Sequence, residues 1–326
     1  MSNSLFLSNC TADTIREAAA ALKAGHLVAF PTETVYGLGA DARNPEAVKR
    51  IYEVKGRPTD HPLIVHISSI IQLEKWACEI PDYAISLART FWPGPMTLIL
   101  KRTHVAGDFI TGGQDTVGLR VPRDPIALAL IQEFEKISDS AIVAPSANRF
   151  GQVSPTSARA VSAELSEHLT SDDQILDGGE CNVGVESTII DCTGMNPRIL
   201  RPGAITKEMI DEVTGLMITS SMEKFSIPEI RFSGSLESHY SPKATVILDL
   251  PPTFGQGFIA LADVPTPEGV IRLASPKNNE EFARLLYASL RDADERGLVQ
   301  VFVIQPKGDD IAIAIRDRLT RAANQV

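Results

Sequence analysis

Side chains suited to binding an anion gather in one stretch of the chain, residues 30–66. Lys55, Arg57 and His61 follow one another closely there, and several hydroxyl groups precede them. Hydroxyls facing a Lys/Arg pair suit a polyanion, and phosphate is the usual one. The alternative is a solvated helix end, which is the ordinary role of an isolated Lys/Arg pair. The stretch therefore predicts a phosphate-binding site, with the solvated helix end as the alternative.

A loop after a short strand would supply the hydroxyl groups. Thr32 and Thr34 follow an expected strand over residues 27–30, and ligands of α/β sheets commonly bind at such carboxyl ends. Gly37 and Gly39 would let the backbone come close to a bound group. The chain has no GxSxG motif, so a serine hydrolase is disfavoured.

A helix should deliver the two cations to this loop. Asn44 can cap its start, Pro45 suits its first turn, and Gly56 ends it. The helix therefore places Lys55 and Arg57 at its frayed end.

Two further strands carry polar side chains. A strand over residues 141–144 is followed by Ser146 and Asn148, which form a second polar loop. Arg120 lies within an apolar strand over residues 117–121. We expect an inward guanidinium that awaits a carboxylate, although an exposed strand cation is the plainer alternative.

The remaining pattern predicts two α/β domains. Residues 1–219 form the first, a serine-rich linker or lid spans 220–242, and residues 243–326 form a smaller parallel sheet in which strands alternate with helices. Helices are expected over 11–24, 45–55, 69–77, 82–91, 125–134, 156–168, 207–213, 280–296 and 311–323. Further strands are expected over 63–67, 96–101, 175–176, 187–192, 198–200, 245–250, 257–262, 269–274 and 299–305.

Composition describes an ordinary globular chain of 326 residues, 44% hydrophobic and 22% charged. No apolar run is long enough to span a membrane and no secretion signal is evident, so a cytoplasmic protein is expected. The four cysteines form no CxxC or Cys/His cluster, which argues against zinc and favours reduced thiols. Up to Pro242 the chain has 21 Lys and Arg against 30 Asp and Glu, so strong direct nucleic-acid binding is not expected.

Several segments together resemble the YrdC-like threonylcarbamoyl-AMP synthases. They are PTETVYGLGADA, KGRPTDHPLIVHI, FWPGPMTLIL, VGLRVP, APSANRFGQVSPTSA, GVESTIID and ILRPGAIT, in that order. They cover roughly residues 10–206, and SHYSP near residue 240 resembles the interdomain linker of the two-domain members. The resemblance implies a YrdC-like twisted mixed sheet with helices, joined to a smaller, Rossmann-like parallel domain.

The resemblance also assigns roles to individual residues. It implies a catalytic tetrad of Lys55, Arg57, Ser146 and Asn148, ATP contacts from Arg57, His61, Thr116, Ser146, Ser154, Arg201 and Tyr240, and threonine contacts from Thr34, His66, Arg120, Ala144 and Ser187. Three of these have alternatives. Ser154 could cap the following helix, Arg201 could be a surface cation, and a lone histidine such as His66 is more often structural.

The implied reaction is that of a nucleotidyltransferase. L-threonine, bicarbonate and ATP would give threonylcarbamoyl-AMP and pyrophosphate, and the product would serve threonylcarbamoyladenosine formation in tRNA through downstream transfer proteins. Mg²⁺ would accompany ATP, held by phosphates and waters, because no cluster of carboxylates marks a metal cage.

Two other functions are alternatives to this one. An RNA-binding or regulatory protein on the same fold conflicts with the acidic first domain. A carbamoyl transferase of the hydrogenase-maturation type would need zinc-finger cysteines that this chain lacks.

The linker gives one further expectation. The segment containing His239 and Tyr240 should fold back across the cleft as a lid, with Tyr240 contacting ATP. The alternative is a plain tether, which its serine content and Gly234 also allow.

Overall fold

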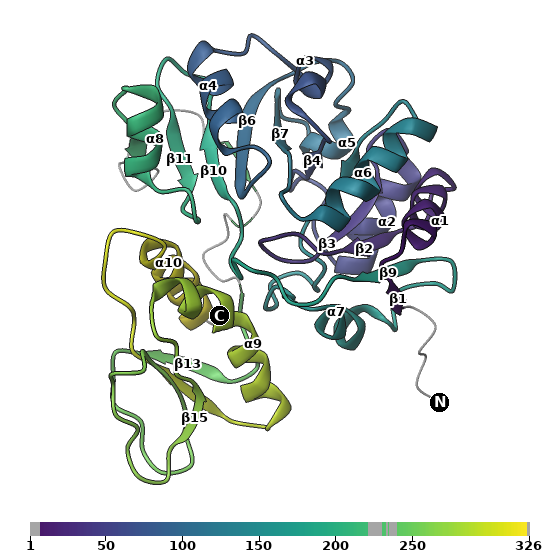
Figure 1. Cartoon of the computed structure of the whole chain (residues 1–326). Helices are drawn as coiled ribbons and strands as arrows, with labels where there is room; N and C mark the ends of the chain where they lie inside the picture. The colour runs from purple at the N-terminus through teal and green to yellow at the C-terminus, as the bar shows by residue number, and fades with distance from the viewer. Residues whose placement is uncertain (1–6, 221–229, 233, 235–239, 325–326) are drawn as a thin grey trace.

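The computed structural model describes residues 7–220, 230–232, 234 and 240–324, and Figure 1 shows two lobes. The larger lobe is built on one sheet that mixes parallel and antiparallel neighbours. In the described residues its strand order is β1 (Leu7–Asn9), β9 (Gln174–Asp177), β2 (Val28–Phe30), β3 (Gly37–Asp41), β8 (Ile142–Val143), β4 (Ile64–His66), β7 (Thr116–Arg120), β6 (Met96–Arg102), β10 (Thr188–Asp191), β11 (Arg198–Arg201) and β12 (Thr219–Ser220), with β5 (Ala77–Cys78) paired to β6.

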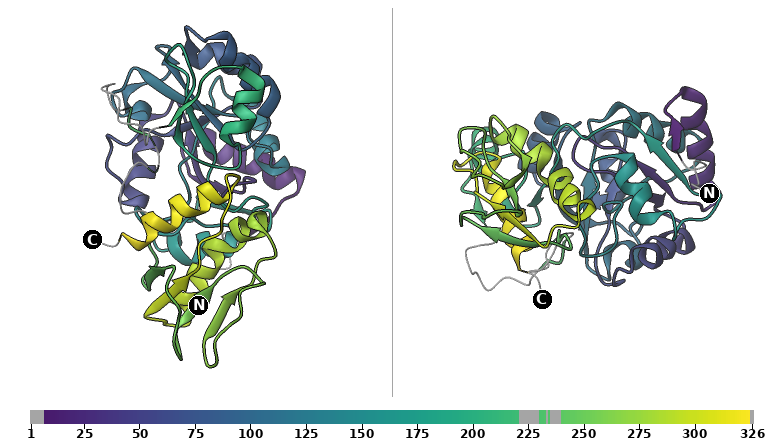
Figure 2. Two further views of the ribbon diagram at one scale, coloured as in Figure 1. Left: turned by 90° about the vertical axis from the view of Figure 1, so that its left-hand side faces the viewer. Right: turned by 90° about the horizontal axis from the view of Figure 1, so that it is seen from below.

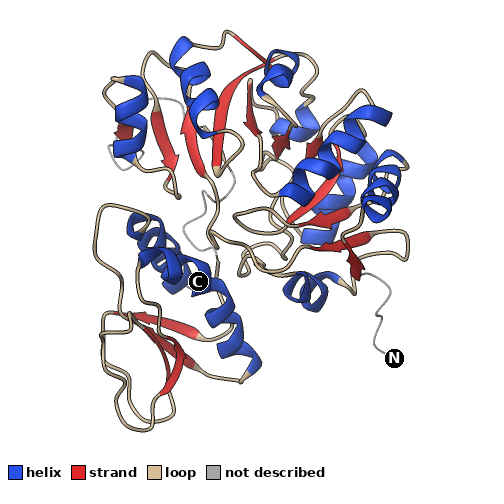
Figure 3. Cartoon of the chain, in the orientation of Figure 1, coloured by secondary structure: helices blue, strands red, loops and turns tan. Residues whose placement is uncertain are grey.

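Helices cover both faces of the larger sheet (Figure 3). On one face, α1 (Ala12–Lys23) and α6 (Pro125–Ile137) pack over Val28 and Phe30. The alternate residues Leu27 and Ala29 join the core on the other face, as the period of two in a strand requires. The other helical segments of this lobe are α2 (Pro45–Lys55), the 3-10 turn η2 (Ile70–Gln72), α3 (Leu73–Trp76), α4 (Asp82–Phe91), α5 (Asp108–Thr111), α7 (Ala158–Leu165) and α8 (Lys207–Thr214).

The smaller lobe has a parallel sheet with the order β13 (Thr245–Leu248), β16 (Gln300–Val303), β14 (Gly257–Ile259) and β15 (Ile271–Ala274). Its helices α9 (Asn279–Glu295) and α10 (Ala312–Ala323) lie between this sheet and the larger lobe (Figures 1 and 2). The predicted fold class, a twisted mixed sheet with helices plus a smaller parallel α/β domain, is confirmed.

Local signals at the ends of α2 position the two predicted cations. The Asn44 side chain accepts hydrogen bonds from the backbone N–H groups of Glu46 and Ala47, each at 3.1 Å. At the other end Gly56 has φ of 63°, a left-handed conformation that glycine adopts at low cost. The helix therefore ends with Lys55 and releases Arg57 into the next loop, as the sequence predicts.

One strand of the site was missed in the sequence. Gly37 and Gly39 were expected in a ligand-binding loop, but they belong to the buried strand β3. A Cβ atom on Gly39 would lie 2.9 Å from both Ile142 and Phe30, so glycine is needed there for packing. Gly37, by contrast, does line the cavity described below.

Candidate active site

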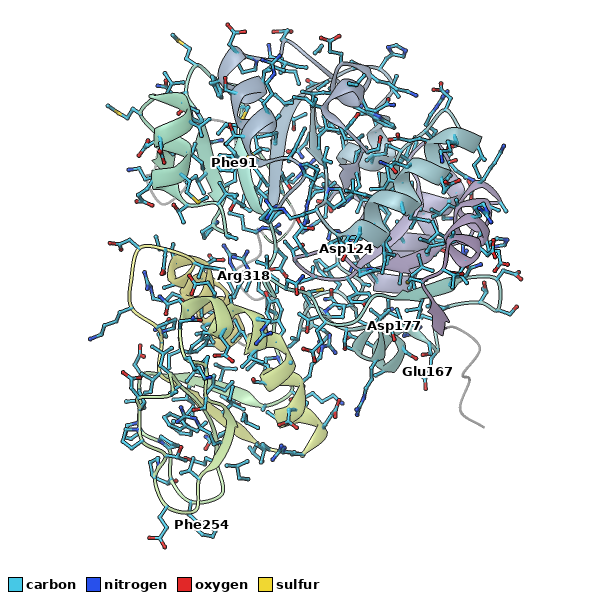
Figure 4. All side chains as sticks on the ribbon, in the orientation of Figure 1. Phe91, Asp124, Glu167, Asp177, Phe254 and Arg318 are labelled. Atoms are coloured by element: carbon cyan, nitrogen blue, oxygen red, sulfur yellow. The ribbon has the colours of Figure 1, made fainter. Side chains whose placement is uncertain are left out.

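A small cavity of about 40 Å³ lies where the strand ends of the larger sheet meet the end of the linker. Eight of the residues expected in the site line it: Thr34, His66, Arg120, Ala144, Ser146, Ser187, Arg201 and Tyr240. They come from segments as far apart in the chain as β2–β3 and the linker, so the fold gathers them at one place. Figure 4 shows the two lobes meeting near Arg318, which is labelled there.

Arg120 points inward, but it already has a carboxylate partner. Its Nη2 donates to Glu33 Oε1 at 2.8 Å, and both side chains are only 6% exposed. The backbone N–H of Arg123 donates to the other Glu33 oxygen at 3.0 Å. Its Nε donates to the Gly94 carbonyl at 3.4 Å, and among the described residues no acceptor is found for Nη1. The sequence did not predict the pairing with Glu33, which orients the guanidinium and leaves Nη1 for a ligand.

Hydrogen bonds within the loop of Thr32 and Thr34 stabilise its conformation. The Thr32 and Thr34 hydroxyls lie 2.8 Å apart, and Thr32 also donates to the carbonyl of Val35 at 2.7 Å. Both side chains are buried. The loop thus presents the Thr34 hydroxyl to the cavity from a fixed position.

His66 is a buried, neutral side chain. Its Nδ1 lies 3.2 Å from the carbonyl oxygen of Ile64, and its ring meets Phe30 edge-on at 6.1 Å between centroids. Burial, together with the positive charge of Arg120, lowers the pKa of His66 to about 3. At neutral pH it can offer a hydrogen bond to a ligand, but no positive charge.

Lys55 is anchored to the loop of Ser146 and Asn148. Its buried Nζ donates to the backbone carbonyl of Ser146 at 2.6 Å and to that of Asn148. Burial, followed by the charge of Arg57, lowers the pKa of Lys55 well below its usual value. Lys55 is therefore brought to the loop of Ser146 and Asn148, although it does not line the cavity itself.

Polar atoms near Lys55 lack partners. The Oδ1 of Asn148 and the Nε of Arg57 are buried and make no hydrogen bond with the described residues. Burial lowers the pKa of Arg57 to about 10, with the charge of Arg201 acting in the same direction. Buried polar groups normally have partners. The Arg57 N–H and the neighbouring cations fit an anionic ligand that would accept from them, whereas the Asn148 oxygen is itself an acceptor and would need a donor.

Ser187 and Arg201 form the opposite wall. Arg201 donates to the Ser187 carbonyl through Nε at 3.1 Å and to the Ser187 hydroxyl through Nη2 at 3.1 Å. The Ser187 hydroxyl also lies 2.8 Å from that of Thr97. Arg201 is buried, so the surface-cation alternative is wrong.

Four of the residues expected to contact ATP do not line the cavity: Arg57, His61, Thr116 and Ser154. His61 is half-buried with its ring edge-on to Phe150 at 5.4 Å between centroids, and burial lowers its pKa. Thr116 begins β7 and pairs with Lys101, at the opposite end of that strand from Arg120.

The helix-cap alternative for Ser154 is wrong, while its contact with ATP stays a prediction. Helix α7 begins at Ala158 and is capped by Ser157, so Ser154 is no helix cap. Its hydroxyl instead donates to Glu186 Oε1 at 2.6 Å. Glu186 lines the cavity and was missed in the sequence, although it directly precedes Ser187 in the quoted segment GVESTIID.

The described end of the linker reaches the cavity. Tyr240 is 1% exposed, lines the cavity and has φ of 63°, unusual for a residue with a side chain. The Ser241 N–H donates to the carbonyl of Gly151 at 3.0 Å, which fastens the segment to the larger lobe. The placement agrees with a segment that folds back over the cleft, while its contact with ATP stays a prediction. His239 lies outside the described residues.

Two general features of the described chain bear on its class. No group of three or more His, Cys, Asp or Glu side chains there could hold a metal ion, and all four cysteines are free. In the same residues no helix is long and apolar enough to cross a membrane.

Comparison with known proteins places the whole chain. The Sua5/YciO/YrdC family model, described as telomere recombination, matches residues 20–203, and the C-terminal domain model of threonylcarbamoyl-AMP synthase matches residues 205–324. The second match begins before α8 and β12, which belong to the larger lobe in space.

Relatives called threonylcarbamoyl-AMP synthase match most of the chain. The protein of Pyrococcus abyssi is 41% identical over 95% of this chain and 94% of its own length, and that of Bacillus subtilis is 40% identical over 95% and 92%. The structure of P. abyssi Sua5 complexed with L-threonine is 39% identical, with a TM-score of 0.86 over 98% of this chain and 96% of that one. Escherichia coli YciO, 23% identical with a TM-score of 0.52, covers 61% of this chain and 94% of its own, and shares the fold. The chain belongs to the Sua5/YciO/YrdC family.

Proposed function

We propose that this protein is a threonylcarbamoyl-AMP synthase, which joins L-threonine, bicarbonate and ATP and releases pyrophosphate. The observation that carries the proposal is the cavity itself. It combines an oriented guanidinium, Arg120, with the small polar groups of Thr34 and His66, and buried cations stand beside it. Relatives that match 95% of the chain bear the same enzymatic name. An RNA-binding or regulatory role finds no comparable support.

The amino acid would bind at the Arg120 side of the cavity. Its carboxylate would accept from Nη1 of the Arg120 guanidinium, since a charged donor and acceptor make the stronger hydrogen bonds. The hydroxyls of Thr34 and Ser187 and the neutral imidazole of His66 would face its side chain. A pocket that pairs a substrate hydroxyl rejects analogues without one, because its own polar groups would be left unpaired.

The nucleotide would bind at the cationic side. The amine of threonine takes up CO2 to give a carbamate, whose oxygen attacks the α-phosphorus of ATP, and pyrophosphate leaves. Both reactants are anions, so the protein must hold them together and offset their repulsion. Lys55, Arg57 and Arg201 carry the charges for this, and Lys55 keeps the Ser146–Asn148 loop in place.

Mg²⁺ would be bound chiefly by ATP. Glu186, which lines the cavity, and Glu33, which pairs with Arg120, both accept hydrogen bonds from protein donors, so they are already engaged. A cation held by phosphate oxygens and waters fits this arrangement, and it would offset part of the phosphate charge. The product would pass to proteins that transfer the threonylcarbamoyl group to tRNA.

The test is pyrophosphate release from ATP with each standard amino acid, with and without bicarbonate. Release should require threonine and bicarbonate together. Serine, which keeps the hydroxyl but lacks the methyl group, and valine, which has a methyl in place of the hydroxyl, are the closest controls. Equal release with alanine, or without bicarbonate, would overturn the proposal.

A further inference from the structure

A buried ion pair joins the smaller lobe to the wall of the cavity. Arg318 on α10 donates through Nε to Glu186 Oε2 at 2.8 Å, and Tyr287 on α9 donates to the same oxygen at 2.9 Å. Arg318 and Tyr287 are 1% and 0% exposed, and Glu186 is 6% exposed. Figure 4 shows Arg318 between α10 and the larger lobe. Helices of the smaller lobe thus hold a carboxylate that lines the cavity.

The same two residues also hold Tyr240. Its ring stacks on that of Tyr287 with centroids 5.7 Å apart and planes 27° apart. The Arg318 guanidinium lies 5.4 Å from the centre of the Tyr240 ring, within the range of a cation–π contact. Glu186 and Tyr240, two parts of the cavity wall, therefore depend on the same pair of side chains.

Charge gives this arrangement its significance. Burial opposes ionisation of Glu186, but the charges of Arg318 and Arg201 and the hydrogen bond from Ser154 outweigh it and lower the pKa to about 2. Glu186 is an anion at neutral pH, in the wall of the cavity and near the cations proposed to bind the nucleotide. Without a compensating cation it would repel phosphate in a region of low dielectric.

We propose that Arg318 and Tyr287 are positioning residues of this active site. Arg318 neutralises Glu186 and, with Tyr287, fixes that carboxylate, so that ATP can bind beside it. The same two side chains hold the Tyr240 ring in place until ATP displaces it. Neither residue need touch the substrate. The inference rests on the proposed function, and it gives the smaller lobe a part in nucleotide binding beyond attachment.

A second ion pair between the lobes provides a matched control. Arg291 on α9 contacts Glu164 on α7 at 2.7 Å, with side chains 19% and 13% exposed. Neither residue lines the cavity. If the ion pairs between the lobes only attach one lobe to the other, losing the Arg291–Glu164 pair and losing the Arg318–Glu186 pair should change ATP binding in the same way.

The experiment compares Arg318→Gln, Arg291→Gln, Glu186→Gln and the double variant Glu186→Gln/Arg318→Gln in the full chain. Arg318→Gln should raise the KM for ATP by about tenfold or more, because the carboxylate of Glu186 then faces the phosphates without the cation that is hydrogen-bonded to it. The KM for threonine should change much less. The double variant should recover most of the ATP affinity, since the repelling charge is gone. Arg291→Gln should keep both KM values even where it lowers the melting temperature.

Further variants guard against a simple folding defect. Arg318→Lys keeps the charge and should retain more ATP affinity than Arg318→Gln, and Tyr287→Phe should lower ATP affinity less than Arg318→Gln does. Binding of a non-hydrolysable ATP analogue, measured by calorimetry, reports the same affinities without turnover. Wild-type KM values in Arg318→Gln, or no recovery in the double variant, would overturn the inference. If the unmodified protein shows no threonine-dependent release of pyrophosphate, the proposed function is overturned instead.

Discussion

Arg120 and Glu33 form a buried ion pair, with Nη2 and Oε1 2.8 Å apart, although they are 87 residues apart in sequence. The pair fixes the guanidinium before any substrate arrives, which removes part of the ordering cost of binding. Glu33 thereby acts on the site through Arg120.

Replacing Arg120 should separate the two substrates. Arg120→Ala removes the charged donor proposed for the threonine carboxylate, which should cost on the order of 2–4 kcal/mol of threonine binding. It also leaves Glu33 buried without its cationic partner, although the Arg123 N–H still donates to it. We expect the KM for threonine to rise by at least about tenfold, far more than that for ATP. Arg123→Ala is the control, because Arg123 is a neighbouring arginine with an exposed side chain. A matched rise for both substrates would show that Arg120 does not bind the amino acid.

Lys55 and Arg57 should act on the triphosphate. Lys55→Ala and Arg57→Ala should each lower turnover by about tenfold or more, since preorganised cations stabilise charge that develops during the reaction. Lys55→Ala should also weaken the anchoring of the Ser146–Asn148 loop. Lys49→Ala removes an exposed lysine from the same helix and should leave the rate unchanged. Near-normal rates in both site variants would show that Lys55 and Arg57 have an ordinary structural role and do not act on the triphosphate.

His66 should make stability depend on pH. Its pKa is about 3 in the folded protein against 6.5 for the free side chain, so the unfolded state binds the extra proton between these values. The contribution of neutral His66 is fully present above pH 6.5 and is lost as the pH falls toward 3, at about 1 kcal/mol per pH unit. Glu186 adds a loss in the same direction below its unfolded pKa of 4.5.

Urea unfolding at pH 5 and pH 7 measures this effect. His66→Gln should reduce the loss of unfolding free energy between the two pH values, while His104→Gln, at an exposed position, should reproduce the wild-type loss. Equal pH dependence in all three proteins would contradict a buried neutral His66.

The features predicted correctly from the sequence are those that local signals specify, such as the ends of a helix. The Asn44 cap and Gly56 determined both ends of α2, and therefore where Lys55 and Arg57 emerge. Strand β3 was missed because Gly37 and Gly39 have low β propensity, and the close packing of Gly39 on Phe30 and Ile142 appears only in three dimensions. The contact of Arg318 with Glu186 spans 132 residues and two lobes, so no periodicity or capping signal could indicate it.

Tyr240 gives the last prediction, on the retention of the intermediate. The cavity is far too small for a nucleotide, with room for only about three water-sized spheres. Tyr240 lines it with a backbone in the left-handed region, a conformation held by its surroundings. We therefore expect Tyr240 to move aside when ATP enters and to return over the acyl-adenylate, which excludes water.

Tyr240→Ala should weaken ATP binding and raise the fraction of intermediate lost to hydrolysis, measured as AMP formed per threonylcarbamoyl-AMP recovered. Tyr240→Phe keeps the ring that stacks on Tyr287, so it should retain the product better than the alanine variant. Tyr83→Ala is the control, because the Tyr83 hydroxyl bonds to Gly194 and lies outside the cavity lining. If Tyr240→Ala and Tyr83→Ala give the same AMP fraction and the same ATP affinity, the linker is a tether and Tyr240 has no part in closing the site.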